Sequence, residues 1–309
     1  MDFDLRSHAI LAVLGAQVIW GIGGPLVKIA LADIPPFGLM FLRFLFSTII
    51  LFVFYEFWLR HHEPPINRSD KKKIFLAGFF GAFLNIALYF LGQKYTTVID
   101  AWIITSLGTP FVLIFSYLFR KERLSKIIYG GVFLAFFGVI IIMGRGLLEL
   151  GQGGFFGNLA MLGGTLSGVI SYLITKDLVT RYHPLLLTYY YFLISLFFAF
   201  PLFLWSYFQD PGWLGNVSTL DLGIIIYLTL GSSIAAYTLN NLGLKFLSAS
   251  LASTIGYTGA IIAISLSIVF LGEQPTPYFL VGTTLIIIGL FLAETRHPSH
   301  PIHKLFQKS

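Results

Sequence analysis

A few polar side chains interrupt long apolar runs of the sequence, and their types suit the noncovalent binding of a small polar molecule. Asn85 and Tyr89 stand four residues apart, so a helix would present both on one face. Amides and phenols donate and accept hydrogen bonds, and burying them without partners is costly. The candidate binding residues are Gln17, Trp20, Asn85, Tyr89, Trp102, Thr105, Ser106, Tyr172, Tyr237, Asn240, Ser253 and Tyr257.

Two basic residues, Arg43 and Lys28, fall within or at the end of these apolar runs. A guanidinium can hold a carboxylate through two parallel hydrogen bonds, so Arg43 is a candidate anion partner. The alternative interpretation, which we favour, is a structural charge that binds backbone carbonyls or a helix end. Lys28 closes its run, where we expect its ammonium to reach the aqueous boundary or, as a second interpretation, to form part of an external gate.

The elements that position these residues must be membrane-spanning helices. The chain of 309 residues is 56 % hydrophobic and 11 % charged, whereas a soluble domain is about 25 % charged. This composition excludes a soluble enzyme and a disordered chain, and the lack of cysteine excludes a disulfide scaffold. Ten runs reach the roughly 20 residues that a span needs: 7–27, 36–58, 74–93, 101–119, 127–144, 150–175, 182–209, 222–244, 246–272 and 274–293.

The basic residues predict the orientation of these spans. With the N-terminus inside, 16 of the 20 Lys and Arg residues lie in inner loops and tails, and two lie in outer loops. Because cytoplasmic loops carry an excess of Lys and Arg, we expect a multi-pass protein of the plasma (inner) membrane with both termini cytoplasmic. The basic run 68–73 is then a loop flank on the bilayer, and no nucleic-acid partner is expected.

Each polar candidate also has a purely structural interpretation. Ser and Thr in membrane helices often bond to their own backbone, while Tyr and Trp often lie in belts at the membrane boundary. Belt positions suit Trp58, Trp205 and Trp213, and for Trp102 a belt and a cavity position are both open. Gly164 and Gly168 form a small-xxx-small face that favours close helix packing.

The chain repeats itself. Four positions recur 148 residues later, with Trp20, Lys28, Pro36 and Arg43 corresponding to Gly168, Lys176, Pro184 and Tyr191. The stretch 94–125 recurs as 245–276. Each half therefore carries five helices, in 9–143 and 154–294, joined by a flexible linker at 151–154 and followed by a cytoplasmic tail, 295–309. Because five is odd, the halves have opposite orientations, a construction typical of secondary transporters with a substrate site near the midplane.

Short motifs follow one another in a characteristic order along both halves. They are Trp20-Gly21 with Lys28, Pro36 with Arg43-Phe44, Thr105-Ser106 with Pro110, Glu122-Arg123-Leu124-Ser125, Ala249-Ser250-Leu251-Ala252-Ser253, Leu271-Gly272-Glu273, and Gly282 with Gly289. Their order resembles that of the EamA family in the drug/metabolite transporter superfamily. The resemblance implies a ten-helix exporter of small metabolites, often amino acids, that uses no ATP and lines its cavity with spans 1, 3, 4, 6, 8 and 9.

The sequence departs from the family pattern at one place. The family usually has a proline in helix 9 at the position that matches Pro110, and here Ala260-Ile261 stand there. The hinge-like break expected in helix 9 therefore lacks its proline, and Gly256 and Gly259 are the remaining sources of flexibility.

The function predicted from these features is export of a small metabolite by alternating access, with no cofactor, metal ion or enzymatic activity. The aromatic, amide-rich and nearly uncharged candidate site favours an amino acid. Alternatives are a nucleotide-sugar or phosphorylated metabolite, which would need several cations, a drug-like compound, or a receptor without transport. No acid lies deep in a predicted span, so a proton relay is not expected. The expected partners are the small-molecule metabolite and the lipid bilayer, with the protein a monomer or weak dimer.

Overall fold

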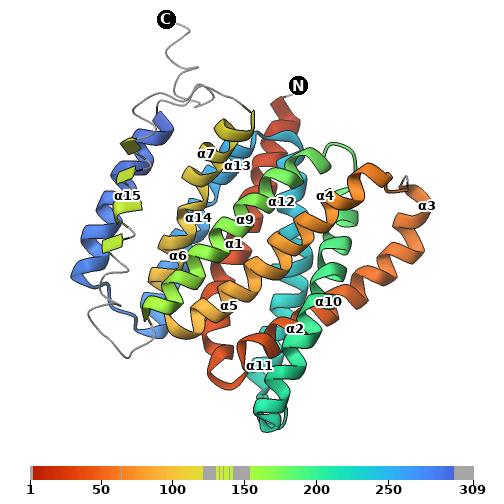
Figure 1. Ribbon diagram of the computed structural model, residues 1–309, viewed down its shortest axis with the longest axis horizontal. Helices are drawn as coiled ribbons and strands as arrows, with labels where there is room; N and C mark the ends of the chain where they lie inside the picture. Colours follow the sequence, from red (N-terminus) through yellow and green to blue (C-terminus); the bar gives the residue numbers. More distant parts are fainter. Residues whose placement is uncertain are drawn as a thin grey trace, which may run out of the picture.

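The computed structural model is a bundle of helices (Figure 1). It describes residues 3–63, 65–120 and 154–295, with short helical pieces between 130 and 141. Within these residues every regular element is helical, and eight segments are long and apolar enough to cross a membrane: Leu5–Asp33, Pro36–His62, Arg68–Tyr95, Val98–Phe115, Gly154–Leu178, Pro184–Gln209, Thr219–Phe246 and Leu251–Leu271. The predicted all-helical membrane fold is confirmed at this level.

The helices follow the predicted spans in order. Their bounds are α1 Phe3–Asp33, α2 Pro36–Phe54, α3 Arg60–His62, α4 Arg68–Gly78, α5 Asn85–Tyr95, α6 Val98–Ser106, α7 Gly108–Arg120, α9 Gly154–Leu178, α10 Pro184–Gln209, α11 Thr219–Tyr227, α12 Ala236–Phe246, α13 Ala249–Ile255, α14 Tyr257–Leu271 and α15 Pro277–Thr295. Most of the predicted fifth helix, most of the linker 151–154 and nearly all of the tail lie outside the described residues.

The helices begin where the sequence provides capping groups. Pro36 and Pro184 open α2 and α10, at positions where a missing N–H costs nothing. Ser218 and Asp221 exchange hydrogen bonds in a capping box that starts α11. The Phe279 N–H donates to Thr276 Oγ1 at 3.2 Å, which caps the start of α15.

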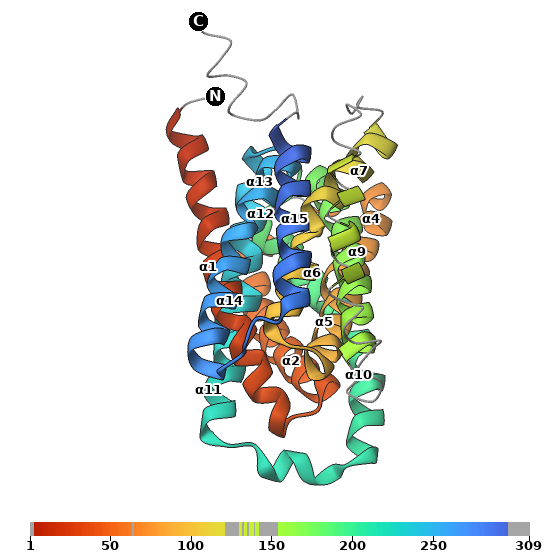
Figure 2. The same cartoon turned by 90° about the vertical axis from the view of Figure 1, so that its left-hand side faces the viewer.

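The two halves of the chain interlock rather than stand apart. α5 packs along α9, α1 packs along α12 and α14, and α2 packs along α10. α1 begins and α15 ends at the same end of the bundle, whereas α10 and α11 extend furthest at the other end (Figures 1 and 2). The most extensive helix contacts among the described residues therefore each join a first-half helix to a second-half helix.

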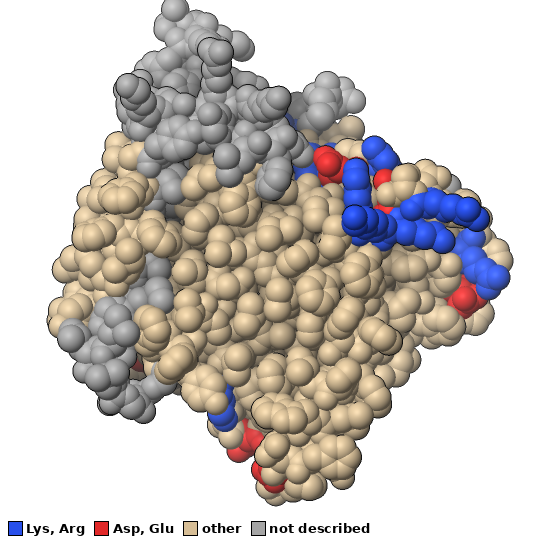
Figure 3. All heavy atoms as spheres, viewed as in Figure 1, with Lys and Arg blue, Asp and Glu red and all other residues tan. Residues whose placement is uncertain are grey.

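The surface has the pattern of a protein that faces lipid. Figure 3 shows a broad band without charged groups, with Lys and Arg gathered over α3 and α4. Large apolar side chains face outwards, and Phe197 and Phe270 are each 73 % exposed. Trp58 and Trp205 are exposed, as expected for belt residues, but the belt prediction for Trp213 is wrong, because its ring is 2 % exposed and packs against Gly38.

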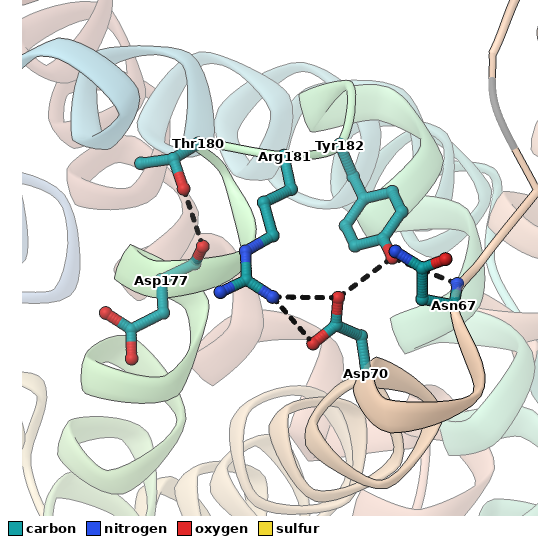
Figure 4. A network of polar contacts seen from close by, with 6 residues as sticks. All are labelled: Asn67, Asp70, Asp177, Thr180, Arg181 and Tyr182. Carbon is teal, nitrogen blue, oxygen red and sulfur yellow. Dashed lines mark hydrogen bonds and ion pairs between the residues drawn. The ribbon is translucent and has the colours of Figure 1, made fainter.

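A polar network joins the two halves next to α4 (Figure 4). Asp70 is buried and accepts hydrogen bonds from Arg181 Nη1, at 3.1 Å to each oxygen, and from the Tyr182 hydroxyl at 3.0 Å. The Tyr182 hydroxyl in turn accepts from the Asn67 N–H at 3.1 Å. Asp70 therefore ties the start of α4 to the turn between α9 and α10.

Asp70→Ala should lower the thermal unfolding midpoint of the purified protein by several degrees, because it leaves the buried Tyr182 hydroxyl without its acceptor. Glu56→Ala is the matched control, since Glu56 forms only an exposed ion pair with Arg60 four residues on. Equal midpoints for the two variants in one detergent would contradict this role for Asp70.

Candidate functional site

A cavity of about 300 Å³ lies between the two halves. Its walls come from the first, third and fourth spans of the first half and from the corresponding spans of the second half. These are the six spans expected from the sequence, and Arg43 of α2 and Tyr191 of α10 complete the lining. The structure brings all twelve candidate residues to this one cavity: Gln17, Trp20, Asn85, Tyr89, Trp102, Thr105, Ser106, Tyr172, Tyr237, Asn240, Ser253 and Tyr257.

Two π-helical segments, Phe79–Leu84 and Leu228–Ala235, bend the third span and its counterpart in the second half. After the first segment the Asn85 N–H bonds to the carbonyl of Phe80, and after the second the Ala236 N–H bonds to that of Gly231, each five residues back instead of four. In a regular α-helix these N–H groups would bond to the carbonyls of Gly81 and Ser232, which therefore lose their usual helical donors. Single π-turns of this kind are frequent at functional sites.

These two carbonyls are held by aromatic donors from the opposite half. The Tyr237 hydroxyl donates to Gly81 O at 3.1 Å, and Trp20 Nε1 donates to Ser232 O at 2.9 Å. The Trp20 and Tyr237 rings also meet edge to face, with centroids 5.4 Å apart. Gly81 and Ser232 are 151 positions apart, the repeat shift itself. Sequence reasoning missed both carbonyls, although the repeat register could have paired them.

The fourth span and its second-half counterpart are both broken at the cavity. α6 ends at Ser106 and α13 at Ile255, and the next N–H groups, of Leu107 and Gly256, bond only three residues back. Thr109 Oγ1 then donates to Ser253 O at 3.0 Å, across from α7 to α13. The break in helix 9 therefore forms without the proline, at Gly256, one of the two glycines named from the sequence as a source of flexibility. The Ser253 carbonyl accepts both the Gly256 N–H and the Thr109 hydroxyl.

The hydroxyls of the candidate residues differ in what they bind. Thr105 and Ser106 donate to carbonyls of their own helix, at 2.9 and 2.8 Å. Their hydroxyl protons therefore bond to the backbone, as the structural interpretation expects. The Tyr89 hydroxyl accepts from Gln93 Nε2 at 2.8 Å. Asn85 Nδ2 donates to Gly164 O at 2.7 Å, which ties α5 to α9. In the described residues these groups form a fixed polar wall.

Arg43 is the one charged side chain among the described residues that line the cavity. It is only 3 % exposed, Nε donates to Ser233 Oγ at 2.6 Å, and the guanidinium carbon lies 5.8 Å from the centre of the Phe90 ring. A central arginine costs roughly 2.5–3.5 kcal/mol to insert in a membrane helix, so it needs compensation. The Ser233 bond and the Phe90 ring supply part of that compensation.

Lys28 lies outside the cavity. Its Nζ donates to Gln93 O at 2.7 Å and to Thr96 O at 2.6 Å, at the end of α5. Lys176, its counterpart in the repeat, donates at 2.6 Å to Leu244 O and to Leu247 O at the end of α12. Each lysine thus caps the carbonyl end of a neighbouring helix, a favourable place for a cation. Sequence reasoning aligned the two lysines but had no means to place their partners.

Comparison with known proteins gives one consistent result. The sequence model of the EamA-like transporter family matches residues 7–144 and 155–295. An uncharacterized transporter of Archaeoglobus fulgidus is 28 % identical over 293 residues, covering 94 % of this chain and 98 % of its own. The pseudopaline exporter CntI of Pseudomonas aeruginosa is 23 % identical, covering 92 % and 95 %. A solved crystal structure shares the fold, with a TM-score of 0.62, 18 % identity and coverage of 98 % and 100 %.

Proposed function

The chain belongs to the EamA-like transporter family, and from that membership we propose that it exports a small metabolite, an amino acid, by alternating access. Like its relatives, it is a membrane transporter and not an enzyme. The observation that carries the proposal is the cavity between the halves, which is lined by corresponding spans of both. Such a site can be exposed to each side in turn when the halves rock against each other.

The architecture proposed with this function has ten spans in two inverted repeats, 9–143 and 154–294, with both termini in the cytoplasm. The two matches of the family model support the repeat boundaries. The paired π-segments, the paired broken spans and the pair Lys28 and Lys176 support a common fold for the halves. The shared end of the bundle at which α1 begins and α15 ends supports termini on one side (Figure 1).

An amino acid suits the size and chemistry of the cavity. Its volume of about 300 Å³ is at the small end of the roughly 300–1,000 Å³ of ligand pockets. Arg43 is the one charge among its described lining residues, whereas a phosphorylated metabolite or nucleotide-sugar would need several cations. Because no acid is among those residues, coupling through a buried carboxylate is not part of the proposal. The relative named as a pseudopaline exporter supports export as the direction of transport.

The proposal is tested by counterflow into liposomes that contain the purified protein. Liposomes preloaded with each of the common amino acids should accumulate the same labelled compound faster than protein-free liposomes do. If none is exchanged but another metabolite raises the unfolding temperature, the amino-acid assignment fails and the class of that metabolite replaces it. If nothing is exchanged or bound, transport itself is refuted.

Tyr89→Ala should raise the KM for counterflow several-fold without lowering expression, because it removes an aromatic side chain that lines the cavity and accepts a hydrogen bond from Gln93. Tyr278→Ala is the control, since Tyr278 is 44 % exposed and is not among the lining residues. Normal transport kinetics in a well-expressed Tyr89→Ala protein would remove Tyr89 from the site.

A further inference from the structure

We infer that Arg43 binds the carboxylate of the transported molecule, so that the cavity selects singly carboxylated compounds over their neutral and multiply anionic analogues. This inference rests on the proposed transport function and names the chemistry of its substrate. It goes against the purely structural interpretation of Arg43 that the sequence favoured. Four features of the described residues carry it.

The first feature is a buried charge with no counter-charge. Arg43 is 3 % exposed, and none of the described residues forms an ion pair with it. Removing a charge from water is costly unless an opposite charge or a full set of hydrogen bonds compensates for it. A single bond to a neutral hydroxyl does not do so. A substrate carboxylate would supply the missing charge.

The second feature is the way the guanidinium is oriented. Nε is anchored to Ser233 Oγ at 2.6 Å, and the Phe90 ring lies 5.8 Å from the central carbon. The two Nη groups have no hydrogen bond to any described residue, and Arg43 is part of the cavity lining. An arginine anchored at Nε keeps a planar pair of donors, and this geometry matches the two oxygens of a carboxylate.

The third feature is the asymmetry of the cavity. Tyr191 occupies the repeat position that corresponds to Arg43 and also lines the cavity, but its hydroxyl is paired with Thr175 Oγ1 at 2.9 Å. The two repeat-related lining positions therefore carry a cation in one half and a neutral phenol in the other. A ligand with one carboxylate fits this arrangement in a single orientation, whereas a second carboxylate would be buried without a partner.

The fourth feature is the aromatic and carbonyl lining beside the charge. Trp20 and Tyr237 meet edge to face within the cavity wall, and Tyr237 bonds to Gly81 O. Such rings bind apolar groups by contact and ammonium groups over their faces. An amino acid could therefore place its carboxylate on Arg43 and its remaining groups against this wall, without any acidic residue.

The test compares leucine and three of its analogues as competitors of counterflow by the reconstituted protein. They are leucine, leucinamide, 4-methylpentanoate, which keeps only the carboxylate, and 3-methylbutylamine, which keeps only the amine. The same four are assayed for thermal stabilisation of the protein in detergent. We expect the two carboxylates to bind at least tenfold more tightly than the two compounds that lack one, and glutamate to bind no better than leucine.

Arg43→Gln should remove this tenfold preference, and Arg43→Lys should retain part of it, because an ammonium keeps the charge but not the paired donors. Ser233→Ala is the matched control, since it removes the anchor and keeps the charge, so the preference should persist. A folded Arg43→Gln protein that still prefers carboxylates overturns the inference. If that variant does not fold, equal binding of leucine and leucinamide to the wild type overturns it.

Failure of the proposed function gives a different result. If no amino acid is transported, but 4-methylpentanoate stabilises the wild type and not Arg43→Gln, the carboxylate site stands and the substrate assignment falls. If leucine is transported and leucinamide competes equally well, transport stands and the role of Arg43 falls.

Discussion

Gly157→Val is expected to abolish the folded protein, and Gly157→Ala to lower its stability sharply. A β-carbon at Gly157 would lie 2.8 Å from the carbonyl carbon of Tyr95, 2.9 Å from the Gly92 oxygen and 3.0 Å from the Thr96 nitrogen. All three are backbone atoms, so no side chain can turn away to make room. Overpacking of this kind costs about 1–3 kcal/mol for a small group and more for a branched one.

The effect should extend to the cavity, because this contact sets the distance between α5 and α9. These helices supply Asn85, Tyr89 and Tyr172, and Asn85 Nδ2 reaches Gly164 O at 2.7 Å only while their backbones stay close. Without a strong hydrophobic drive between helices in lipid, close backbone packing carries much of the association. A looser contact would therefore weaken both folding and substrate binding.

The measurement is the yield of monodisperse protein on size exclusion and its thermal unfolding midpoint in one detergent. Gly223→Ala is the matched control, since a β-carbon at Gly223 in α11 would meet no atom within 4 Å. Alanine there should leave the midpoint unchanged or raise it, because it is the better helix former by about 1 kcal/mol. A Gly157→Ala protein as stable as wild type would show that α5 and α9 are not packed as described.

What the sequence predicted well depends on hydropathy and on repeat register. Apolar runs fix how many residues can lie in lipid, so the order of the described spans agreed with expectation. The i, i+4 spacing of Asn85 and Tyr89 placed both on the cavity side of α5. The 148-residue shift paired Lys28 with Lys176, and both cap a helix end.

What the sequence did not predict depends on partners far along the chain. The carbonyls capped by Lys28 belong to residues 65 and 68 positions away. The residues around Lys28 therefore could not show whether its ammonium caps a helix or reaches the aqueous boundary. The π-segments shift a hydrogen bond by one residue, which leaves apolar periodicity almost unchanged. Trp213, in the segment Pro211–Asn216 between two spans, looked like a boundary residue because its burial depends on Gly38 of α2, far away in the sequence.

Glu273, of the Leu271-Gly272-Glu273 motif, forms hydrogen bonds between the two halves of the chain. Its carboxylate oxygens accept the N–H groups of Val98 at 2.8 Å and of Ile99 at 3.0 Å. These are first-turn amides of α6, which have no partner within the helix and lie at its positive end. Glu273 belongs to the turn between α14 and α15, so the contact joins the second half to the first, one turn from Trp102 of the cavity.

In the orientation and alternating-access cycle proposed above, this contact lies on the extracellular side, and we expect that it breaks when the cavity opens there. Glu273→Gln is therefore expected to increase outward exposure of the cavity about tenfold. A hydrogen bond to a charged acceptor contributes about 1.5–3 kcal/mol and one to a neutral acceptor about 0.5–1.5. Losing the charge should thus shift the equilibrium between closed and open states by about 1.4 kcal/mol, which is a factor of ten.

The chain contains no cysteine, so a single reporter can measure this opening directly. Ser106→Cys places a thiol on the cavity wall, and its reaction rate with a membrane-impermeant maleimide added to intact cells reports outward exposure. The rate should rise about tenfold when Glu273→Gln is added and stay unchanged with Glu56→Gln, whose carboxylate forms only an exposed pair with Arg60. Equal rates in all three proteins would mean that the Glu273 contact does not limit opening on that side, because weakening a contact that limits opening must increase the fraction of open protein.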